Sequence, residues 1–321
     1  MEQYPYSCSV VVPVYNSEQT LELLVAELGR ILPMICPAFE VILVNDGSPD
    51  RSWELICKLS ACYPWLRGIK LMRNYGQHNA LLCGIRAAQK EIVITMDDDL
   101  QHPPAEIPRL LEGINQGYDV VYGFPRKLPH SFWRNQFSRL TKRVLAFVMG
   151  IKTVREISAF RAFRSDLRNA FSNYNSSGVI IDVLLSWGTT HFTSVPVNEE
   201  QRQHGTSNYT FTKLISQAFL ILTGFSIAPL RFASWLGFFF TLFGIAIFLY
   251  VLVIYVTLGS IPGFPFLASI IALFSGAQLF TLGIFGEYLA RVFDRSMDHP
   301  TYVIDQTVGK LTEPESSKEQ S

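Results

Sequence analysis

Three consecutive aspartates, Asp97, Asp98 and Asp99, are the residues of this sequence that most clearly indicate chemistry. Neighbouring carboxylates repel one another and cost stability unless a cation or hydrogen bonds compensate them. Hard oxygen ligands suit Mg²⁺ or Mn²⁺, whose coordination is often completed by substrate phosphates. The aspartates directly follow residues 91–96, an apolar stretch typical of a buried strand. This context favours a divalent cation site over an acidic surface turn.

A further carboxylate, Asp46, follows another apolar stretch, residues 39–45. A carboxylate at the end of a strand can accept hydrogen bonds from a nucleobase or a ribose. The sequence Asp-Gly-Ser is also typical of turns and helix N-caps. We interpret Asp46 as a ligand contact, and Ser48 and Asp50 as capping residues.

The elements that must position these side chains alternate along the first part of the chain. Strands are expected at residues 9–13, 39–45, 66–72, 91–96 and 120–122, and helices at residues 20–32, 50–62 and 77–89. This alternation predicts an α/β fold whose mostly parallel sheet is covered on both faces. Ligands of such sheets bind beyond the carboxyl ends of the strands. Polar clusters follow each of the first four strands, so we expect one pocket there.

Charge and hydropathy favour a membrane protein over a nucleic-acid-binding protein. The 321 residues include 27 Lys and Arg and 27 Asp and Glu, and this net charge of zero lacks the basic excess of a nucleic-acid binder. No charged residue and no histidine occurs from Phe232 through Gly286. Since one membrane span needs about 20 apolar residues, we expect a hairpin of two transmembrane helices, at about 232–258 and 266–290.

The positive residues around this hairpin predict its orientation. Lys213 and Arg231 precede the hairpin, Arg291 and Arg295 follow it, and its turn is uncharged. By the positive-inside rule, the N-terminal domain and both termini are expected in the cytoplasm. We expect a catalytic domain at 1–209 with a basic interfacial helix near 132–148, a juxtamembrane helix at 210–230, the hairpin at 231–291 and a tail at 292–321.

The motifs taken together resemble those of family 2 glycosyltransferases. More narrowly, they resemble the polyprenyl-phosphate glycosyltransferases, which include dolichol-phosphate mannose synthases, bactoprenol glucosyltransferases and undecaprenyl-phosphate aminoarabinose transferases. The matching motifs are VVPVYN, VNDGSPDRS, RNYGQHNA, DDDLQHPP and the hairpin ending in GEYLARV. The resemblance covers about Ser9 to Ile304. It implies a Rossmann-like GT-A fold with a membrane hairpin.

The resemblance also implies an activity and a place in the cell. A sugar would pass with inversion from a nucleotide sugar, with UDP favoured, to undecaprenyl phosphate or another polyprenyl phosphate. The site would face the cytoplasm at the bacterial inner membrane, and the product would serve the cell envelope. The family further suggests a homo-oligomer, a tetramer. Neither the sugar nor the downstream pathway is specified by any one motif.

Individual residues of this chain acquire implied roles by their match to the family's motifs. The residues implied to bind the metal, Mg²⁺ or Mn²⁺, are Asp97, Asp99 and Gln101. The residues implied to contact the nucleotide sugar are Pro13, Tyr15, Asp46, Asp97 and Arg202. The residues implied to act in catalysis, the last three of them on the acceptor phosphate, are Asp99, Arg126, Arg134 and Ser138.

Some positions depart from the family's pattern. Asp98 stands where the family often has Ala, Ser17 replaces a common acidic residue, and Asn208 replaces a common Lys. Arg161 matches a family arginine, although the residues before it differ. The resemblance assigns no role to Asp98 or Glu287.

The chemistry of the acceptor predicts how such a reaction would be catalysed. A phosphate monoester has a second pKa of about 6, so it is largely anionic at pH 7 and needs little help from a general base. The protein must instead gather anions that repel one another, and arginine suits this task because it donates two parallel hydrogen bonds. Positioning and charge stabilisation would then supply most of the rate.

Three other functions are compatible with parts of the sequence. A processive polysaccharide synthase usually has more spans and a Q-x-x-R-W motif, which the sequence around Arg202 does not match. A membrane-anchored scaffold with a degenerate nucleotide-binding domain has no physical reason to keep clustered carboxylates. A transporter needs a polar pathway, which two apolar helices do not provide. The enzyme hypothesis is therefore favoured.

Overall fold

The computed structural model describes residues 3–126, 157–175, 178–199, 228–258, 263–297 and 299–309. The chain forms two compact units, Met1–Thr210 with His299–Ser321, and Phe211–Asp298. The interfacial helix expected near 132–148 and most of the helix expected at 210–230 lie outside the described residues. Arg134, Ser138 and Arg202 lie outside them as well.

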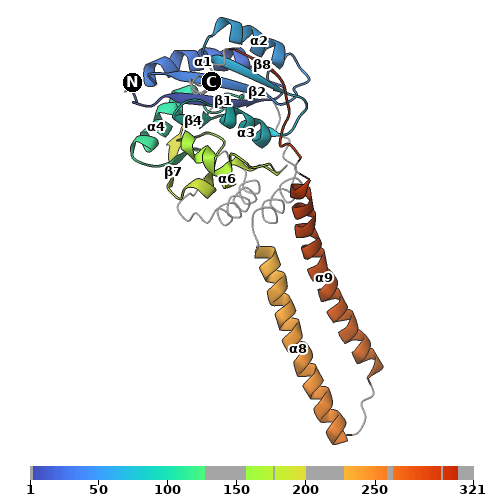
Figure 1. Cartoon of the computed structure of the whole chain (residues 1–321). Helices are drawn as coiled ribbons and strands as arrows, with labels where there is room; N and C mark the ends of the chain where they lie inside the picture. Colours follow the sequence, from blue (N-terminus) through green and yellow to red (C-terminus); the bar gives the residue numbers. More distant parts are fainter. Residues whose placement is uncertain are drawn as a thin grey trace, which may run out of the picture. The chain divides into compact units, whose positions relative to one another are not determined.

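The described part of the first unit is built on one sheet of eight strands (Figure 1). They are β1 (Cys8–Val14), β2 (Phe39–Asn45), β3 (Leu66–Leu71), β4 (Ile92–Thr95), β5 (Val120–Pro125), β6 (Arg161–Arg164), β7 (Phe192–Val197) and β8 (Ile304–Val308). Their order across the sheet is β7-β5-β6-β4-β1-β2-β3-β8. The central strands β3, β2, β1 and β4 are parallel, as the alternating sequence pattern predicted. β6 and β8 run antiparallel to their neighbours.

Helices cover both faces of this sheet. They are α1 (Leu21–Ile35), α2 (Ser52–Cys62), α3 (Gln77–Ala87), α4 (Ile107–Asn115) and α6 (Ile181–Gly188), with short 3₁₀ helices η1 (Pro104–Glu106) and η2 (Ser165–Phe171). The apolar side chains of α1, α2 and α4 pack in one cluster with Val10, Val12 and Val14 of β1. The intervening Val11 faces α3, where it lies 2.3 Å from the position that a Cβ on Gly84 would occupy. Strand side chains alternate between faces, so β1 contributes to both layers of the core.

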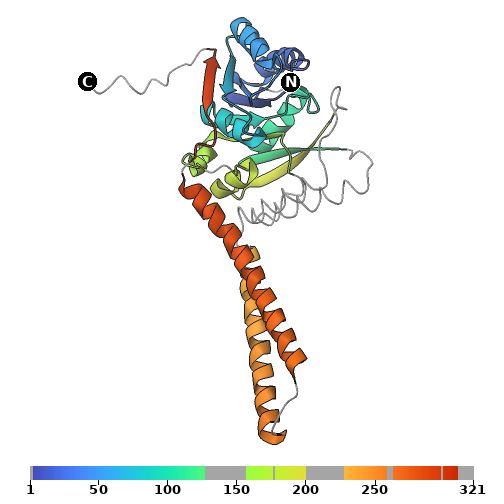
Figure 2. The same ribbon diagram turned by 90° about the vertical axis from the view of Figure 1, so that its right-hand side faces the viewer.

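Strand β8 returns the chain to the sheet after the second unit. It pairs antiparallel with β3 at the edge of the sheet (Figure 2). The Lys70 ammonium lies 3.0 Å from the Asp305 carboxylate, and the Trp53 indole N–H donates to Gln306 Oε1 at 3.1 Å. The sequence pattern assigned these residues to a tail and did not predict this strand.

The second unit contains two long helices, α8 (Ala228–Leu258) and α9 (Phe264–Ser296). They pack against each other, and Phe274 of α9 lies 5.8 Å from Phe240 and 6.5 Å from Phe243 between ring centroids. In the part of the chain that the structure describes, one helical segment is long and apolar enough to cross a membrane, Pro229–Ile254. Glu287 forms an ion pair with Arg291 one turn later, at 2.8 Å.

Candidate functional site

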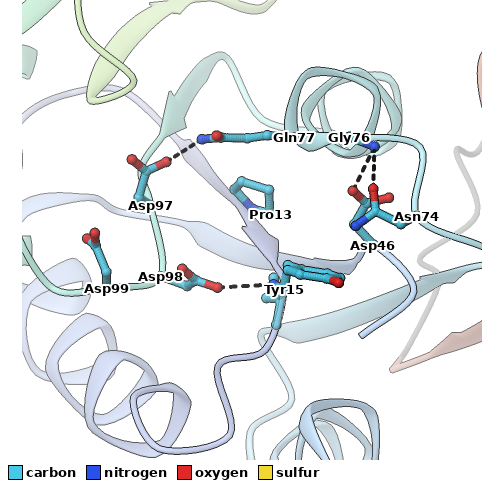
Figure 3. A pocket seen from close by; sticks show the side chains of 10 residues that line it. Pro13, Tyr15, Asp46, Asn74, Gly76, Gln77, Asp97, Asp98 and Asp99 are labelled. Atoms are coloured by element: carbon cyan, nitrogen blue, oxygen red, sulfur yellow. Dashed lines mark hydrogen bonds between the residues drawn. The ribbon is translucent and has the colours of Figure 1, made fainter. Parts of the chain in front are cut away.

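A pocket of about 260 Å³ lies at the carboxyl ends of the parallel strands (Figure 3). Its walls come from the residues that follow four strands, which meet at this edge because the strands run in one direction. The residues that line it are Pro13, Val14, Tyr15, Asp46, Asn74, Gly76, Gln77, Asp97, Asp98 and Asp99. Five residues to which the family resemblance gives a role therefore share one pocket: Pro13, Tyr15, Asp46, Asp97 and Asp99.

Asp46 is fixed by hydrogen bonds from the loop that follows β3. Its two carboxylate oxygens accept the backbone N–H groups of Tyr75 at 2.7 Å and Gly76 at 2.8 Å. Its side chain is buried, and burial raises the pKa of Asp46 above its ordinary value, while these two N–H groups partly offset that rise. Asp46 thus orders the wall of the pocket that Asn74, Gly76 and Gln77 form.

Gly47 allows the turn after Asp46 to lie close to the next loop. Its φ of +64° is in the left-handed region, which residues other than glycine rarely adopt. A Cβ atom at this position would lie 2.6 Å from both the carbonyl carbon of Arg73 and the backbone nitrogen of Asn74. The Asp-Gly-Ser sequence therefore forms a turn and also carries a carboxylate that lines the pocket.

The three aspartates have different partners (Figure 3). Asp97 accepts a hydrogen bond from the Gln77 side-chain amide at 2.6 Å. Asp98 accepts the Tyr15 backbone N–H at 3.2 Å and the hydroxyl of a residue on the same turn, Ser17. Asp99 accepts the Gln101 backbone N–H at 3.1 Å. Each aspartate of the triplet therefore accepts hydrogen bonds from a different part of the chain.

Burial strongly affects the ionisation of Asp98. Desolvation raises the pKa of Asp98 to about 6, although the bonds from Ser17 and Tyr15 favour the charged form and act in the opposite direction. The nearby Asp99 carboxylate raises this pKa further. Asp98 is thus a partly buried carboxyl whose oxygen is already engaged by protein donors.

The donor chemistry at Asp97 and Asp99 fits a divalent cation. Both carboxylates line the pocket and offer the hard oxygen atoms that Mg²⁺ and Mn²⁺ prefer. Among the residues that the structure describes, no three or more His, Cys, Asp or Glu side chains are gathered closely enough to hold a metal ion by themselves. Substrate phosphate oxygens and water commonly complete the coordination of Mg²⁺ at carboxylate sites.

Two predicted site residues lie within the described chain but do not line this pocket. Gln101 follows the triplet and contributes its backbone N–H to Asp99. Arg126 is exposed just after β5, and its backbone N–H donates to the Val197 carbonyl oxygen at 3.2 Å. The other residues predicted to bind phosphate, Arg134, Ser138 and Arg202, lie outside the described residues.

Arg161 is buried and does not line the pocket, and its contacts are with other parts of the fold. Its guanidinium forms an ion pair with Asp182 and donates through Nε to the Thr95 hydroxyl oxygen at 3.0 Å. Asp182 also accepts the Tyr122 hydroxyl at 2.9 Å. This network joins β4, β5, β6 and α6, and Thr95 is the last residue of β4, the strand that precedes the aspartates.

Sequence reasoning did not single out Gln77, Asn74 or Gly76, although it noted the polar cluster that follows the third strand. Gln77 is the first residue of α3, and its amide contacts Asp97, 20 residues away. Two histidines near the site are partly enclosed by the fold. His78 lies in α3, and the His102 ring stacks on Phe160 with 5.1 Å between centroids.

Comparisons with known proteins match this architecture. The family model described as glycosyl transferase family 2 matches residues 9–171, a range that includes every residue lining the pocket. The undecaprenyl-phosphate 4-deoxy-4-formamido-L-arabinose transferase of Edwardsiella ictaluri is 33% identical over 97% of this chain and 97% of its own length. The protein of the same name from Pseudomonas aeruginosa strain PAO1 is 34% identical over 96% of this chain and 92% of its own length.

Solved structures confirm the fold. Glucosyl-3-phosphoglycerate synthase from Mycobacterium tuberculosis, crystallised with Mn²⁺ and UDP-glucose, matches with a TM-score of 0.50 and 18% identity, over 68% of this chain and 77% of that one. A further mycobacterial protein matches with a TM-score of 0.51 and 18% identity, over 68% of this chain and 73% of that one. The predicted GT-A α/β fold with a mostly parallel sheet is therefore confirmed.

Proposed function

Because this chain belongs to glycosyl transferase family 2, we propose that it transfers a sugar from a nucleotide sugar to undecaprenyl phosphate. The observation that carries this proposal is the extent of the match to transferases named for that lipid carrier. The match covers 97% of the chain and therefore includes helices α8 and α9 as well as the pocket. Identity of 33% supports the same type of reaction and leaves the sugar to experiment.

The nucleotide sugar would occupy the pocket at the strand ends. Tyr15 lines the pocket with half of its surface exposed, 51%, and can contact a base or ribose. Pro13 and Asp46 complete this wall, and Asp46 holds the loop that faces them. We favour UDP as the nucleotide, and the UDP-glucose complex of a structure with the same fold is compatible with this choice.

Asp97 and Asp99 would hold Mg²⁺ or Mn²⁺, with Gln101 as a further ligand. When bound, the cation would act as a Lewis acid that neutralises the leaving diphosphate. Gln77 fixes the orientation of Asp97, and the Gln101 backbone fixes that of Asp99. Carboxylates held in this way need little rearrangement when the donor arrives.

The acceptor phosphate would be held by Arg126, Arg134 and Ser138, and Arg202 would contact the donor diphosphate. An anionic phosphate oxygen attacks the anomeric carbon from the side opposite the leaving group, which inverts the configuration. The new bond joins this oxygen to the sugar, and the electron pair of the broken bond leaves with the nucleoside diphosphate. No side chain has to remove a proton, because the phosphate is already largely ionised at pH 7 with a second pKa of about 6.

Helices α8 and α9 would form a membrane hairpin that keeps the catalytic domain at the cytoplasmic face of the inner membrane. A polyprenyl phosphate cannot leave the bilayer, so its transferase must work at the surface. The apolar segment Pro229–Ile254 supports one span. The run without charged residues from Phe232 to Gly286 supports a second span in α9.

A direct test measures glycolipid synthesis. Membranes containing the full chain are incubated with undecaprenyl phosphate, Mg²⁺ or Mn²⁺ and labelled nucleotide sugars, including UDP-4-deoxy-4-formamido-L-arabinose. We expect one donor to yield label that is extracted into organic solvent, and we expect EDTA or Asp99→Ala to abolish it. Glu112→Gln, a change on an exposed face of α4, is the matched control. Label found only in polymeric or water-soluble product would refute the lipid acceptor.

Topology is tested by labelling cysteines in intact cells with a membrane-impermeant maleimide. A Ser260→Cys variant places a thiol in the proposed periplasmic turn. We expect this variant to be labelled from outside, while the native protein, with exposed Cys62 in its catalytic domain, is labelled only after the cells are opened. Labelling of the native protein in intact cells would refute the cytoplasmic orientation.

A further inference from the structure

The turn between β1 and α1 contributes Tyr15 to the pocket and is held by its backbone. Asn16 has a φ of 63°, so the turn includes a left-handed residue. The Asn16 N–H donates to Ser48 Oγ at 3.2 Å, and the Ser17 N–H donates to Ser52 Oγ at 3.0 Å. These two bonds tie the turn to the loop after β2 and to the first residue of α2.

Asp98, on the turn after β4, binds the same β1–α1 turn from a second direction. The Tyr15 N–H donates to Asp98 Oδ2 at 3.2 Å, and the Ser17 hydroxyl contacts the same oxygen. The Ser17 hydroxyl also lies 3.1 Å from the Tyr15 carbonyl oxygen, so it is held within the turn. Asp98 therefore contacts Ser17 and Tyr15, which precede it in sequence by 81 and 83 positions.

Asp98 differs from its neighbours in the direction of its side chain. It points toward the Tyr15 backbone, whereas Asp97 points toward Gln77 (Figure 3). One Asp98 oxygen takes both donors, and each is a hydrogen bond to a charged group, which is stronger than a neutral one. This oxygen is engaged before any cation or nucleotide binds.

We propose that Asp98 is a positioning residue that holds the Tyr15–Ser17 turn against the metal-binding turn, and that it is not itself a metal ligand. This inference rests on the proposed function, because it takes Asp97 and Asp99 as the ligands. Asp98 fixes the separation between the wall that contacts the nucleoside and the carboxylates that face its diphosphate. The nucleotide then meets a formed pocket instead of having to order the turn.

Substitution of Asp98 separates positioning from metal binding. An asparagine keeps one side-chain oxygen, which can accept both the Tyr15 N–H and the Ser17 hydroxyl, whereas an alanine keeps none. We expect Asp98→Ala to raise the donor KM roughly 10-fold, with a smaller change in kcat and no change in the metal concentration for half-activation. We expect Asp98→Asn to restore most of the donor KM and Asp99→Asn to lose metal activation.

Ser17 provides a second variant that tests the same contact. Ser17→Ala removes the hydroxyl and should raise the donor KM by less than Asp98→Ala. The donor KM of the double variant should be no higher than that of Asp98→Ala alone, because Ser17→Ala and Asp98→Ala remove the same Ser17–Asp98 contact. Thermal unfolding of each full-length variant in detergent checks that it is folded, with Glu112→Gln as the distant control.

Binding of UDP with Mn²⁺, measured by calorimetry without acceptor, separates this inference from the proposed reaction. If the wild-type protein binds UDP but forms no glycolipid, the acceptor assignment fails. The UDP dissociation constant of Asp98→Ala relative to that of the wild-type protein still tests the role of Asp98. A metal half-activation concentration or Mn²⁺ affinity that changes about 10-fold in Asp98→Asn, as in Asp99→Asn, would overturn the inference. Unchanged UDP binding in a folded Asp98→Ala, or no UDP binding by the wild-type protein, would overturn it as well.

Discussion

Four carboxylates line the pocket, and the donors that contact them give each a different task. Asp46 takes two backbone N–H groups and orders a loop. Asp98 takes one N–H group and one hydroxyl and orders a turn. Asp97 and Asp99 have their orientations set by Gln77 and Gln101 while they line the pocket. Two carboxylates, Asp46 and Asp98, thus hold backbone segments of the site, and the other two are the ones that we propose bind a cation.

Asp46→Asn tests the residue that holds the loop after β3. An asparagine can accept one of the two backbone N–H groups, and its NH₂ group would face the other, leaving a buried donor unsatisfied at a cost of about 1–3 kcal/mol. We expect the loop to shift and the nucleotide dissociation constant to rise roughly 10-fold, a change of about 1.4 kcal/mol. Calorimetric titration with nucleotide and Mn²⁺ measures it. Binding as tight as that of Glu112→Gln would show that the two bonds do not order the pocket.

Two arginines of β6 allow the stability contribution of a buried ion pair to be compared with that of an exposed one. Arg161 is 1% exposed and paired with Asp182, whereas Arg164 has a side chain that is 40% exposed and lies 3.4 Å from Asp119. We expect Arg161→Gln to destabilise the fold by about 3–5 kcal/mol, because a charge is left buried and uncompensated. Arg164→Gln should cost less than about 1 kcal/mol, since the pair is screened by water. Thermal unfolding midpoints that fall equally would contradict this difference.

At the scale of elements, the site depends on how closely two strand-to-helix loops approach each other. The loop after β2 passes Gly47 against the backbone of the loop after β3. Each loop holds part of the pocket wall, and neither is helix or strand there. The packing at Gly47 therefore sets where Asp46 meets Tyr75 and Gly76.

Gly47→Ala tests this close approach. The new methyl group would lie 2.6 Å from backbone atoms, and φ of +64° is unfavourable for alanine, so we expect a lower unfolding midpoint and weaker nucleotide binding. Gly117→Ala is the control, since its φ is +96° but no atom lies within 4 Å of the added Cβ. The control measures the backbone strain alone, about 1–3 kcal/mol. Equal losses in both variants would show that the approach of the loops is not limiting.

At the scale of the whole molecule, the chain leaves the catalytic unit before α8 and comes back to it with β8. The returning segment is attached by more than its strand pairing. The Arg86 guanidinium lies over the Tyr302 ring at 5.8 Å, and it also donates to the Tyr174 carbonyl oxygen at 2.7 Å. The residues after the long helices are therefore part of the catalytic fold.

Truncation tests the contribution of β8. A chain that stops after His299 loses the strand, exposes the β3 edge and loses the Lys70–Asp305 and Trp53–Gln306 contacts. We expect a lower thermal midpoint and aggregation in detergent, because an uncovered strand edge can pair with another chain. A chain that stops after Gly309 keeps β8 and should behave as the full chain does. Equal midpoints for both truncations would show that the strand adds no stability.

The sequence by itself predicted the central strands and the chemistry that follows them. Their apolar, β-branched stretches are buried on both faces, so the pattern is continuous and can be read locally. β2 begins and ends at the predicted residues, and the first and third strands differ from their predicted ends by one residue. Because parallel strands end at one edge, the sequence also predicted that Asp46, Asp97 and Asp99 would lie together, as they do.

Only the tertiary structure decided the features that depend on contacts between distant residues. β6 is four residues long with an arginine at each end, and β8 is largely exposed, so neither has a strand pattern of its own. Likewise, Asp98 is one of three identical neighbours in sequence, and its contact with Ser17 across 81 positions sets it apart. A run of apolar residues indicates a buried strand, and this can be seen within the segment itself. Which distant residue a side chain contacts depends on the segments that the fold brings together, so no local pattern predicts it.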